Sequence, residues 1–161
     1  MEANSSRVMS WLQPQEILLD VDARDREHAL EIAAAAIGKA HALDPMPILR
    51  ALRRREQVGS TALGNGFAIP HARIGGIARP TTVFIRTTIA LPFDAPDHKP
   101  VSHLLVIMVP SDGANEDHLR LLALVARLFS DAVFRNEIHA APDVATATEA
   151  FRAGIARLTG R

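Results

Sequence analysis

The chain has 161 residues, about the length of one domain. Apolar residues make up 48% of it and charged residues 22%, a globular composition that argues against disorder. Eighteen basic side chains balance eighteen acidic ones, so the chain has no net positive charge to attract DNA or RNA. Cysteine is absent, which excludes disulfides, thiolate zinc sites, iron–sulfur clusters and cysteine nucleophiles.

The apolar runs of the sequence are short. The first twenty residues lack the apolar stretch of a secretory signal, and the longest run, Leu104–Val109, is far too short to span a bilayer. We therefore expect a cytoplasmic protein without membrane insertion. Residues 1–14 are expected to form an N-terminal arm, loose or interfacial, before a single domain over residues 15–158.

Hydrophobic spacing and capping residues predict the long elements. Asp44 followed by Pro45 is typical of a helix start, and Asp22 and Asp25 are alternative N-caps for the preceding helix. The expected elements are a strand over residues 17–21, helices that end at residue 40 and near residue 59, strands over 81–89 and 101–109, and helices that begin at residue 117 and at residue 146.

Residues 59–80 have a different character, because seven glycines and prolines fall within them, and we expect turns and short strands there. By contrast, Val101–Val109 is nearly all apolar, which suits a strand covered on both faces. Helices in both halves of the chain around such a strand predict an α/β fold. We expect a three-layer α/β/α sandwich on a small mixed sheet of four or five strands.

The segment from Arg55 to Arg73, REQVGSTALGNGFAIPHAR, carries the clearest chemical signal. Its glycines lack the Lys-Ser/Thr ending and the GxGxxG spacing of nucleotide-binding loops, so nucleotide binding is not supported. Pro70 restricts the backbone beside it, which leaves the ring of His71 little freedom. An imidazole held in this way can act as a general base, a metal ligand or a nucleophile toward phosphorus.

Three blocks of sequence together resemble the enzyme IIA domains of the bacterial phosphoenolpyruvate-dependent phosphotransferase system, in the fructose/mannitol class. The blocks run from Arg55 to Arg73, from Pro92 to Val101, and from Val109 to Leu119. The likeness is greatest to the free-standing nitrogen-regulatory branch. One departure is Phe67, which stands where a smaller aliphatic residue is common in the family.

This resemblance implies a role for three residues. His71 would be the phosphorylated residue, His118 the second active-site histidine, and Arg55 the arginine over the phosphoryl site. The family phosphorylates the Nε2 atom, so we expect a tele-phosphohistidine at His71. No cofactor and no metal is implied, and the expected activity is that of a phosphotransferase component, more regulatory than catalytic.

Elementary chemistry agrees with these roles. An attacking imidazole must be neutral, and one ring N–H must be held by an acceptor so that the other nitrogen presents its lone pair. Phosphoryl transfer mainly requires alignment and charge stabilisation, which a guanidinium group such as that of Arg55 supplies. His118 shares a helical face with Leu122 and Val125, and either Asn115 or Asp117 can cap this helix. We therefore expect a neutral His118 that donates a hydrogen bond to the phosphoryl group on His71.

The remaining polar candidates are weaker. Ser60 and Asn65 are candidates for binding phosphoryl oxygens, although turn formation explains them equally well. Glu56 is expected to pair locally and His103 to be a buried histidine with its hydrogen bonds satisfied. Two groups are expected to be surface residues: Arg50, Arg53 and Arg54, and His28, His41, His98 and His139.

Four functions remain open at this point. The first is a phosphocarrier that receives phosphate from a histidine phosphocarrier protein and regulates targets such as sensor kinases or potassium transporters, which fits a chain without an attached IIB or IIC domain. The second is the IIA subunit of a fructose- or mannitol-type permease that passes phosphate to a IIB protein. The third is a zinc hydrolase that uses His71, His103 and His118, although paired ligand spacing is missing. The fourth is a purely structural interaction domain.

Overall fold

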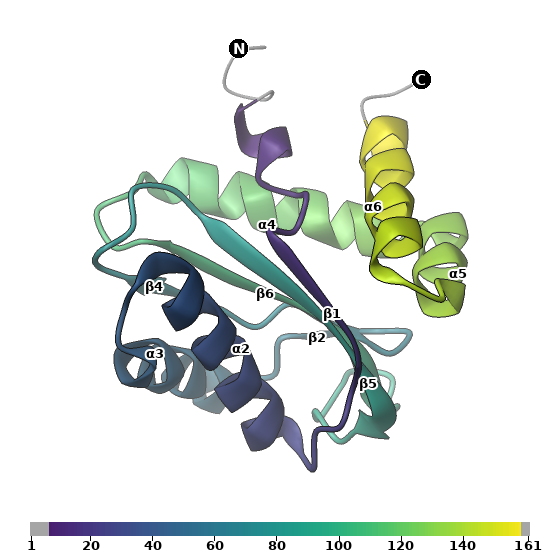
Figure 1. Cartoon of the computed structure of the whole chain (residues 1–161), viewed down its shortest axis with the longest axis horizontal. Helices are drawn as coiled ribbons and strands as arrows, with labels where there is room; N and C mark the ends of the chain where they lie inside the picture. The colour runs from purple at the N-terminus through teal and green to yellow at the C-terminus, as the bar shows by residue number, and fades with distance from the viewer. Residues whose placement is uncertain (1–6, 159–161) are drawn as a thin grey trace.

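The structure is a computed structural model that describes residues 7–158. It is a three-layer α/β/α sandwich on a mixed sheet of six strands (Figure 1). The strands are β1 (Glu16–Val21), β2 (Ala62–Gly64), β3 (Phe67–Ala68), β4 (His71–Ile74), β5 (Thr81–Leu91) and β6 (Val101–Pro110). The helices are α2 (Arg26–His41), α3 (Pro45–Val58), α4 (Asn115–Phe129), α5 (Ala132–Ala140) and α6 (Val144–Leu158).

The sandwich confirms the expected fold class, and the strand count is higher than the expected four or five. The additional strands come from the glycine- and proline-rich segment. β2, β3 and β4 contain only three, two and four residues. Strands this short give no readable alternation of polar and apolar residues, so their number could not be predicted from the sequence.

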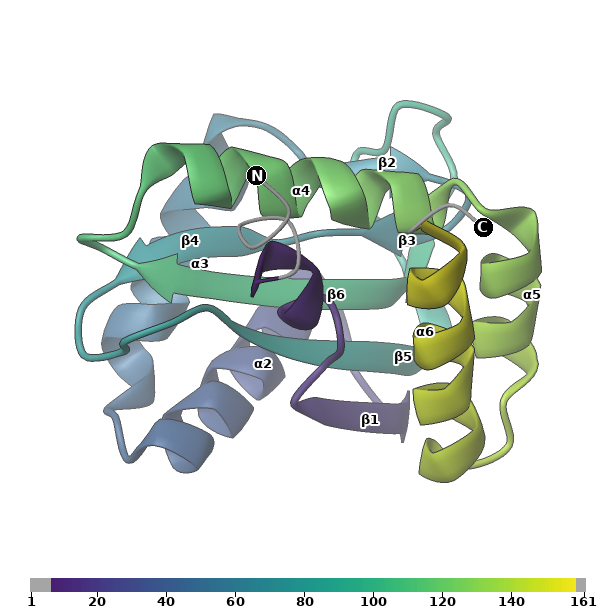
Figure 2. The same cartoon turned by 90° about the horizontal axis from the view of Figure 1, so that it is seen from above.

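Strand β6 is the centre of the sheet (Figure 2). It pairs antiparallel with β5, and parallel with both β3 and β4, which follow one another along the same edge of β6. In this register Phe67 lies beside His103, and His71 lies beside Ile107. The strand order is β1-β5-β6-β3-β2, with β1 parallel to β5.

The side chains of β6 are buried on both faces, as expected for a doubly covered strand. Leu104, Val106 and Met108 face the core formed with α2 and α3. Leu105, Ile107 and Val109 alternate with them and face a second core formed with α4, α5 and α6. Figure 1 shows α2 and α3 on one side of the sheet and the other three helices on the opposite side.

Local side chains define where the first two long helices begin. Asp25 caps α2 by accepting a hydrogen bond of 2.8 Å from the backbone of His28, and Asp44 caps α3 in the same way. The expected side-chain cap of α4 was wrong. Its N-cap is Ala114, which has no side chain to accept a bond, and Asn115 accepts a hydrogen bond from Arg73 instead.

The N-terminal arm is not loose in its described part. Residues 7–10 form a helical turn, and the side chains of Val8 and Leu12 are fully buried in the second core. Arg7 forms an ion pair of 3.0 Å with Asp117 in the first turn of α4. The arm therefore belongs to the folded unit from residue 7 onward, while residues 1–6 lie outside the described part.

Within residues 7–158, none of the helices is both long enough and apolar enough to cross a bilayer.

Burial of the arm predicts a large effect of shortening Leu12. Leu12→Ala should lower the free energy of unfolding by about 2–5 kcal/mol, because it leaves a cavity in a closed core. Urea denaturation measures this change. Ile89→Ala is the matched control, since Ile89 is 54% exposed and its truncation should cost far less. Equal and small effects of the two substitutions would contradict a structural role for the arm.

Candidate functional site

His71 is the first residue of β4 and follows a break in the strand at Pro70. Proline has no N–H, and its fixed φ turns the chain so that the His71 ring lies back over residue 69. Nδ1 of His71 is 2.7 Å from the carbonyl oxygen of Ile69, which can only accept, so Nδ1 carries the proton. The lone pair of the neutral ring is therefore on Nε2, the atom expected to be the nucleophile.

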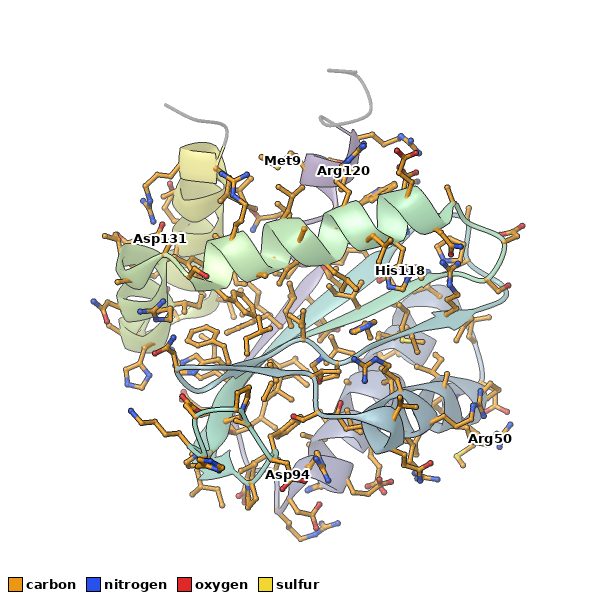
Figure 3. All side chains as sticks on the ribbon, turned by 180° about the vertical axis from the view of Figure 1, so that it is seen from behind. Met9, Arg50, Asp94, His118, Arg120 and Asp131 are labelled. Atoms are coloured by element: carbon orange, nitrogen blue, oxygen red, sulfur yellow. The ribbon has the colours of Figure 1, made fainter. Side chains whose placement is uncertain are left out.

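His118 lies directly opposite His71. It is the fourth residue of α4, and its backbone donates a bond of 3.2 Å to the Ala114 carbonyl. The two imidazole rings meet edge to face, with 5.5 Å between their centroids and 78° between their planes. Figure 3 shows His118 projecting from α4 toward the sheet, with Asp131 marking the other end of the helix.

The Nε2 atom of His118 is buried and has no hydrogen-bond partner among the described residues. A buried polar atom without a partner carries a free-energy cost of about 1–3 kcal/mol, which a bound water molecule or ligand can relieve. Here the atom lies beside the histidine that presents its own lone pair. The two rings together outline a small polar site.

Both histidines are neutral near pH 7. Burial lowers the pKa of His71, and the positive charge of Arg55 lowers it as well, although the hydrogen bond to the Ile69 carbonyl opposes this effect. Burial also lowers the pKa of His118 to about 4, with further contributions from His71 and from Arg73. The unprotonated state that a nucleophilic imidazole requires is therefore the stable one.

Arg55 is near the C-terminal end of α3, next to the glycine-rich turn. Its Nη1 atom donates a hydrogen bond of 2.7 Å to the carbonyl oxygen of Gly59, which fixes the guanidinium beside the turn. Its charge is close enough to depress the pKa of His71. The expectation that Arg55 and His71 belong to one site is consistent with this placement.

Glu56 holds the same turn from the inside. Its carboxylate is buried and accepts hydrogen bonds from the backbone N–H and the hydroxyl of Thr61, at 2.9 and 2.8 Å. The Thr61 carbonyl in turn accepts a bond of 3.0 Å from the backbone of Ile69, whose own carbonyl holds the His71 ring. Glu56 therefore pairs locally, as expected, and this pairing supports the histidine.

Arg73 is a site residue to which the sequence analysis assigned no role. It lies two residues after His71 on β4, and residues at this spacing share a face of a strand. Its guanidinium donates to the carbonyls of Pro110 and Gly113 and to the side chain of Asn115, and its charge lowers the pKa of His118. The spacing of two residues from His71 was the sequence signal that could have identified Arg73 as a site residue.

The two predicted phosphoryl ligands are placed differently. The hydroxyl of Ser60 donates to the Phe93 carbonyl and accepts a bond of 3.1 Å from the Ala62 backbone, contacts that stabilise the turn. Asn65 is at the tip between β2 and β3, where its φ of 59° is left-handed.

Asn65 also lies far from His71 along the sheet. The adjacent carbonyl of Gly66 accepts a bond from the backbone of His103, whereas His71 lies beside Ile107. Four residues of strand correspond to about 13 Å. The structure therefore does not bring Asn65 to the phosphoryl site.

The histidines required for a zinc hydrolase are not assembled. His103 is buried, as expected, and forms hydrogen bonds with Ser102 and His139 rather than approaching His71 and His118. Across the described range, no group of three or more His, Asp or Glu side chains is arranged to hold a metal ion. This alternative therefore has no assembled ligand set.

Two surface predictions need correction. His41 was expected at the surface, but it is half-buried, and its Nε2 atom is enclosed without a partner among residues 7–158. Arg53 is not simply solvated, because its guanidinium pairs with the carboxylate of Glu27 on α2. The Arg53–Glu27 pair joins α3 to α2, and His41 is at the end of α2, so neither residue belongs to the site.

Comparison with known proteins gives consistent matches. Residues 10–153 match the family described as "Phosphoenolpyruvate-dependent sugar phosphotransferase system, EIIA 2". The chain is 35% identical over 137 residues to a "Nitrogen regulatory protein" of Pseudomonas aeruginosa, covering 84% of this chain and 88% of that protein. It is also 35% identical over 121 residues to a "PTS system fructose-specific EIIA component" of Haloferax volcanii, covering 74% of this chain and 78% of that protein.

Solved structures agree with the architecture. The nitrogen regulatory protein IIA-Ntr from Neisseria meningitidis superposes with a TM-score of 0.78 at 31% identity, covering 92% of this chain and 99% of that one. IIA mannitol from Escherichia coli superposes with a TM-score of 0.70 over 84% of this chain and 94% of that one. At 18% identity, the latter likeness concerns the fold alone.

The lowered histidine pKa values predict how stability depends on pH. An unfolded histidine takes up a proton near pH 6.5, whereas His103 and His118 resist protonation down to about pH 4. The unfolded state thus binds more protons across this range, so stability is complete above about pH 6.5 and is lost as the pH falls toward about 4. Urea denaturation at a series of pH values should show this loss.

His103→Gln is the informative variant for this prediction. It removes one buried titrating ring, and His103 at full titration accounts for up to about 3 kcal/mol. The pH dependence of its unfolding free energy should therefore be shallower than that of the parent chain. A stability that does not fall between about pH 6.5 and pH 4, or identical slopes for the two proteins, would contradict the assignment.

Proposed function

Because this chain belongs to the phosphoenolpyruvate-dependent sugar phosphotransferase system EIIA 2 family, we propose that it is a phosphocarrier that accepts a phosphoryl group on Nε2 of His71. The donor is the phosphohistidine of a small histidine phosphocarrier protein. The observation that carries the proposal is the hydrogen bond of 2.7 Å between Nδ1 of His71 and the Ile69 carbonyl. It leaves Nε2 as the nucleophilic atom.

In the transfer step, one P–N bond replaces another. The lone pair of His71 Nε2 forms the new bond to phosphorus, while the donor's P–N bond breaks and its electron pair returns to the donor ring. The proton on Nδ1 stays in place, and the Ile69 carbonyl stabilises the positive charge that the ring acquires. Because the bond broken and the bond formed are alike, the step is nearly balanced in free energy and reversible.

The surrounding groups suit a phosphoryl group that carries negative charge. Within residues 7–158, Arg55 and Arg73 hydrogen-bond to neutral oxygens only and form no ion pair with a carboxylate. Their charges therefore remain available to the transferred group. The unpartnered Nε2 of His118 supplies a hydrogen-bond donor on the opposite side when it carries the ring's proton.

The biological use of this phosphorylation is proposed to be regulatory. Relatives named nitrogen regulatory protein in several bacteria support a regulatory role linked to nitrogen. In this proposal, the phosphorylation state controls partner proteins such as sensor kinases or potassium transporters. The second candidate is a subunit of sugar uptake that passes phosphate to a IIB protein. The fructose-specific relative supports this alternative.

Direct labelling tests the phosphocarrier function. Incubation with phosphoenolpyruvate and the purified upstream proteins should add one phosphoryl group, lost in acid and kept in base, as expected for a phosphohistidine. Mass spectrometry should locate it on His71, and His71→Ala should remain unlabelled, while His98→Ala, which changes an exposed histidine, should be labelled normally. A label on folded His71→Ala would overturn the proposal, as would a bond that survives acid and is lost in base.

The roles of His118 and Arg55 are tested by measuring how fast their variants are phosphorylated. His118→Ala and Arg55→Ala should each accept phosphate more slowly by about 10²–10³-fold, the usual loss when one donor to a developing charge is removed. Rapid-quench measurement of the phosphorylated fraction gives these rates, and His28→Ala serves as the control outside the site. His118→Ala transferring at the parental rate would show that His118 does not contact the phosphoryl group.

Transfer of the phosphate from this chain to a IIB protein distinguishes the regulatory role from the sugar-uptake role. The phosphorylated chain is mixed with a purified IIB protein of the fructose type, and the phosphate on each protein is followed over time. A regulatory protein should keep its phosphate, or lose it only to the upstream donor. Rapid and complete transfer to IIB would favour the sugar-uptake role instead.

A further inference from the structure

A second concave surface lies at the other end of the sheet from His71. Its volume is about 450 Å³, and it lies between the tip of β2 and β3, the start of β6, and helix α5. Figure 2 shows these elements gathered at one end of the sheet, whereas β4 and the first turn of α4 are at the other. Its polar walls are formed by Asn65, Lys99, Ser102, Arg135, Asn136 and His139.

The charge of this pocket is one-sided. Two cationic side chains line it, Lys99 and Arg135, and no carboxylate does. The carboxylate of Asp97 lies beside the pocket: its oxygens accept hydrogen bonds from the backbone N–H groups of Asn65 and Lys99, and the charge of Lys99 helps to lower its pKa. Arg135 donates to the Phe129 carbonyl at 2.9 Å and forms no ion pair within residues 7–158, so its charge is not neutralised there.

The floor of the pocket is polar and firmly held. His103 is stacked on Phe67, with 4.5 Å between the ring centroids, and its two ring nitrogens lie 3.0 Å from the Ser102 hydroxyl and 3.3 Å from His139. Burial lowers the pKa of His103 to about 4, and the charges of His139 and Arg86 lower it as well. The ring beneath the pocket is therefore neutral near pH 7 and brings no negative charge to the site.

Helix α5, one wall of the pocket, is anchored by a buried side chain. Arg86 reaches from β5 to the C-terminal end of α5 and donates to the carbonyls of Ile138, His139 and Ala141, at 3.0, 3.2 and 2.8 Å. These bonds satisfy carbonyls that a helix end leaves without partners. These bonds tie the backbone of the wall that carries Arg135 and His139 to the sheet, which lowers the cost of ordering it when a ligand binds.

We propose that this pocket binds a phosphate monoester of a small polar molecule. A phosphate monoester carries close to two negative charges near pH 7 and three acceptor oxygens, which match the two cations and the surrounding amide and hydroxyl donors. The volume exceeds what a phosphate group alone requires, so a neutral polar part extends toward Asn65 and Asn136. Binding is non-covalent, and the site is separate from His71 and independent of the proposed phosphocarrier function.

Nuclear magnetic resonance of the full chain tests this proposal with glucose 6-phosphate as the probe. Backbone amide signals of Asn65, Ser102 and Asn136 should shift and saturate, and inorganic phosphate should shift the same signals with weaker affinity. Glucose should leave them unchanged. Signals that do not move with glucose 6-phosphate, or that move equally with glucose, would overturn the proposal.

The matched charge reversals use the only two lysines of the chain, Lys39 and Lys99. Both are exposed, so both variants should fold, and thermal unfolding checks this. Lys99→Glu should weaken glucose 6-phosphate binding by at least about tenfold, the loss of a charge-assisted hydrogen bond, while Lys39→Glu should bind as the parent does. Equal affinities for the two variants would refute the site.

Further measurements distinguish binding in this pocket from binding at His71 and from unspecific binding of anions. His71→Ala should bind glucose 6-phosphate unchanged, and Lys99→Glu should still be phosphorylated on His71 at the parental rate. Shifts centred on His71 and His118 instead of α5 would place the ligand at the phosphoryl site and reject the proposal. Citrate binding as tightly as glucose 6-phosphate would also reject it, because the pocket would then recognise anions in general.

Discussion

The proposed phosphoryl transfer depends on one hydrogen bond, in which Nδ1 of His71 donates to the carbonyl of Ile69. A free imidazole exchanges its proton between two nitrogens, and only one of these arrangements presents Nε2 as a nucleophile. Pro70 makes the bond possible by turning the chain between the two partners, and the bonds from Glu56 through Thr61 hold Ile69 in place. The glycine-rich turn therefore supports the proposed geometry of transfer through its hydrogen bonds to Ile69 and not through contact with phosphate.

The second histidine is placed by the central strand. The C-terminal end of β6 lies beside β4, where the backbone of Ser111 donates a bond of 2.8 Å to the Ile74 carbonyl. Helix α4 begins only five residues after β6 ends, and Arg73 ties Asn115 at its start back to β4. The short connection from β6 to α4 and the hydrogen bond from Arg73 to Asn115 therefore fix the position of His118 relative to His71, without a side-chain cap on the helix.

Features carried by long periodic segments could be predicted from the sequence. The cap at Asp44 follows from the adjacent Pro45, and Asp25 was one of the two N-caps expected for α2. The doubly covered β6 follows from its apolar run, and the helical position of His118 follows from the periodicity of α4. Contacts between distant segments could not be predicted in this way, because no local pattern records the register that places Asn65 beside α5 instead of beside His71. The burial of Leu12 was missed for the same reason, since its partners lie far along the chain.

The arginines of this neutral chain fall into two groups, those paired with carboxylates and those bound only to neutral oxygens. The arginines at the two ends of the sheet belong to the second group. Most of those with contacts, including Arg53 and Arg157, pair with carboxylates, whereas Arg55, Arg73, Arg127 and Arg135 bind only neutral oxygens within the described residues. Three of these four arginines lie at the proposed sites: Arg55 and Arg73 around His71, and Arg135 in the pocket beside α5. Their charges are therefore available to an anion there. The separation of the two sites along β6, about 13 Å, exceeds the Debye length of about 8 Å at physiological ionic strength. Charge alone therefore couples the two sites only weakly.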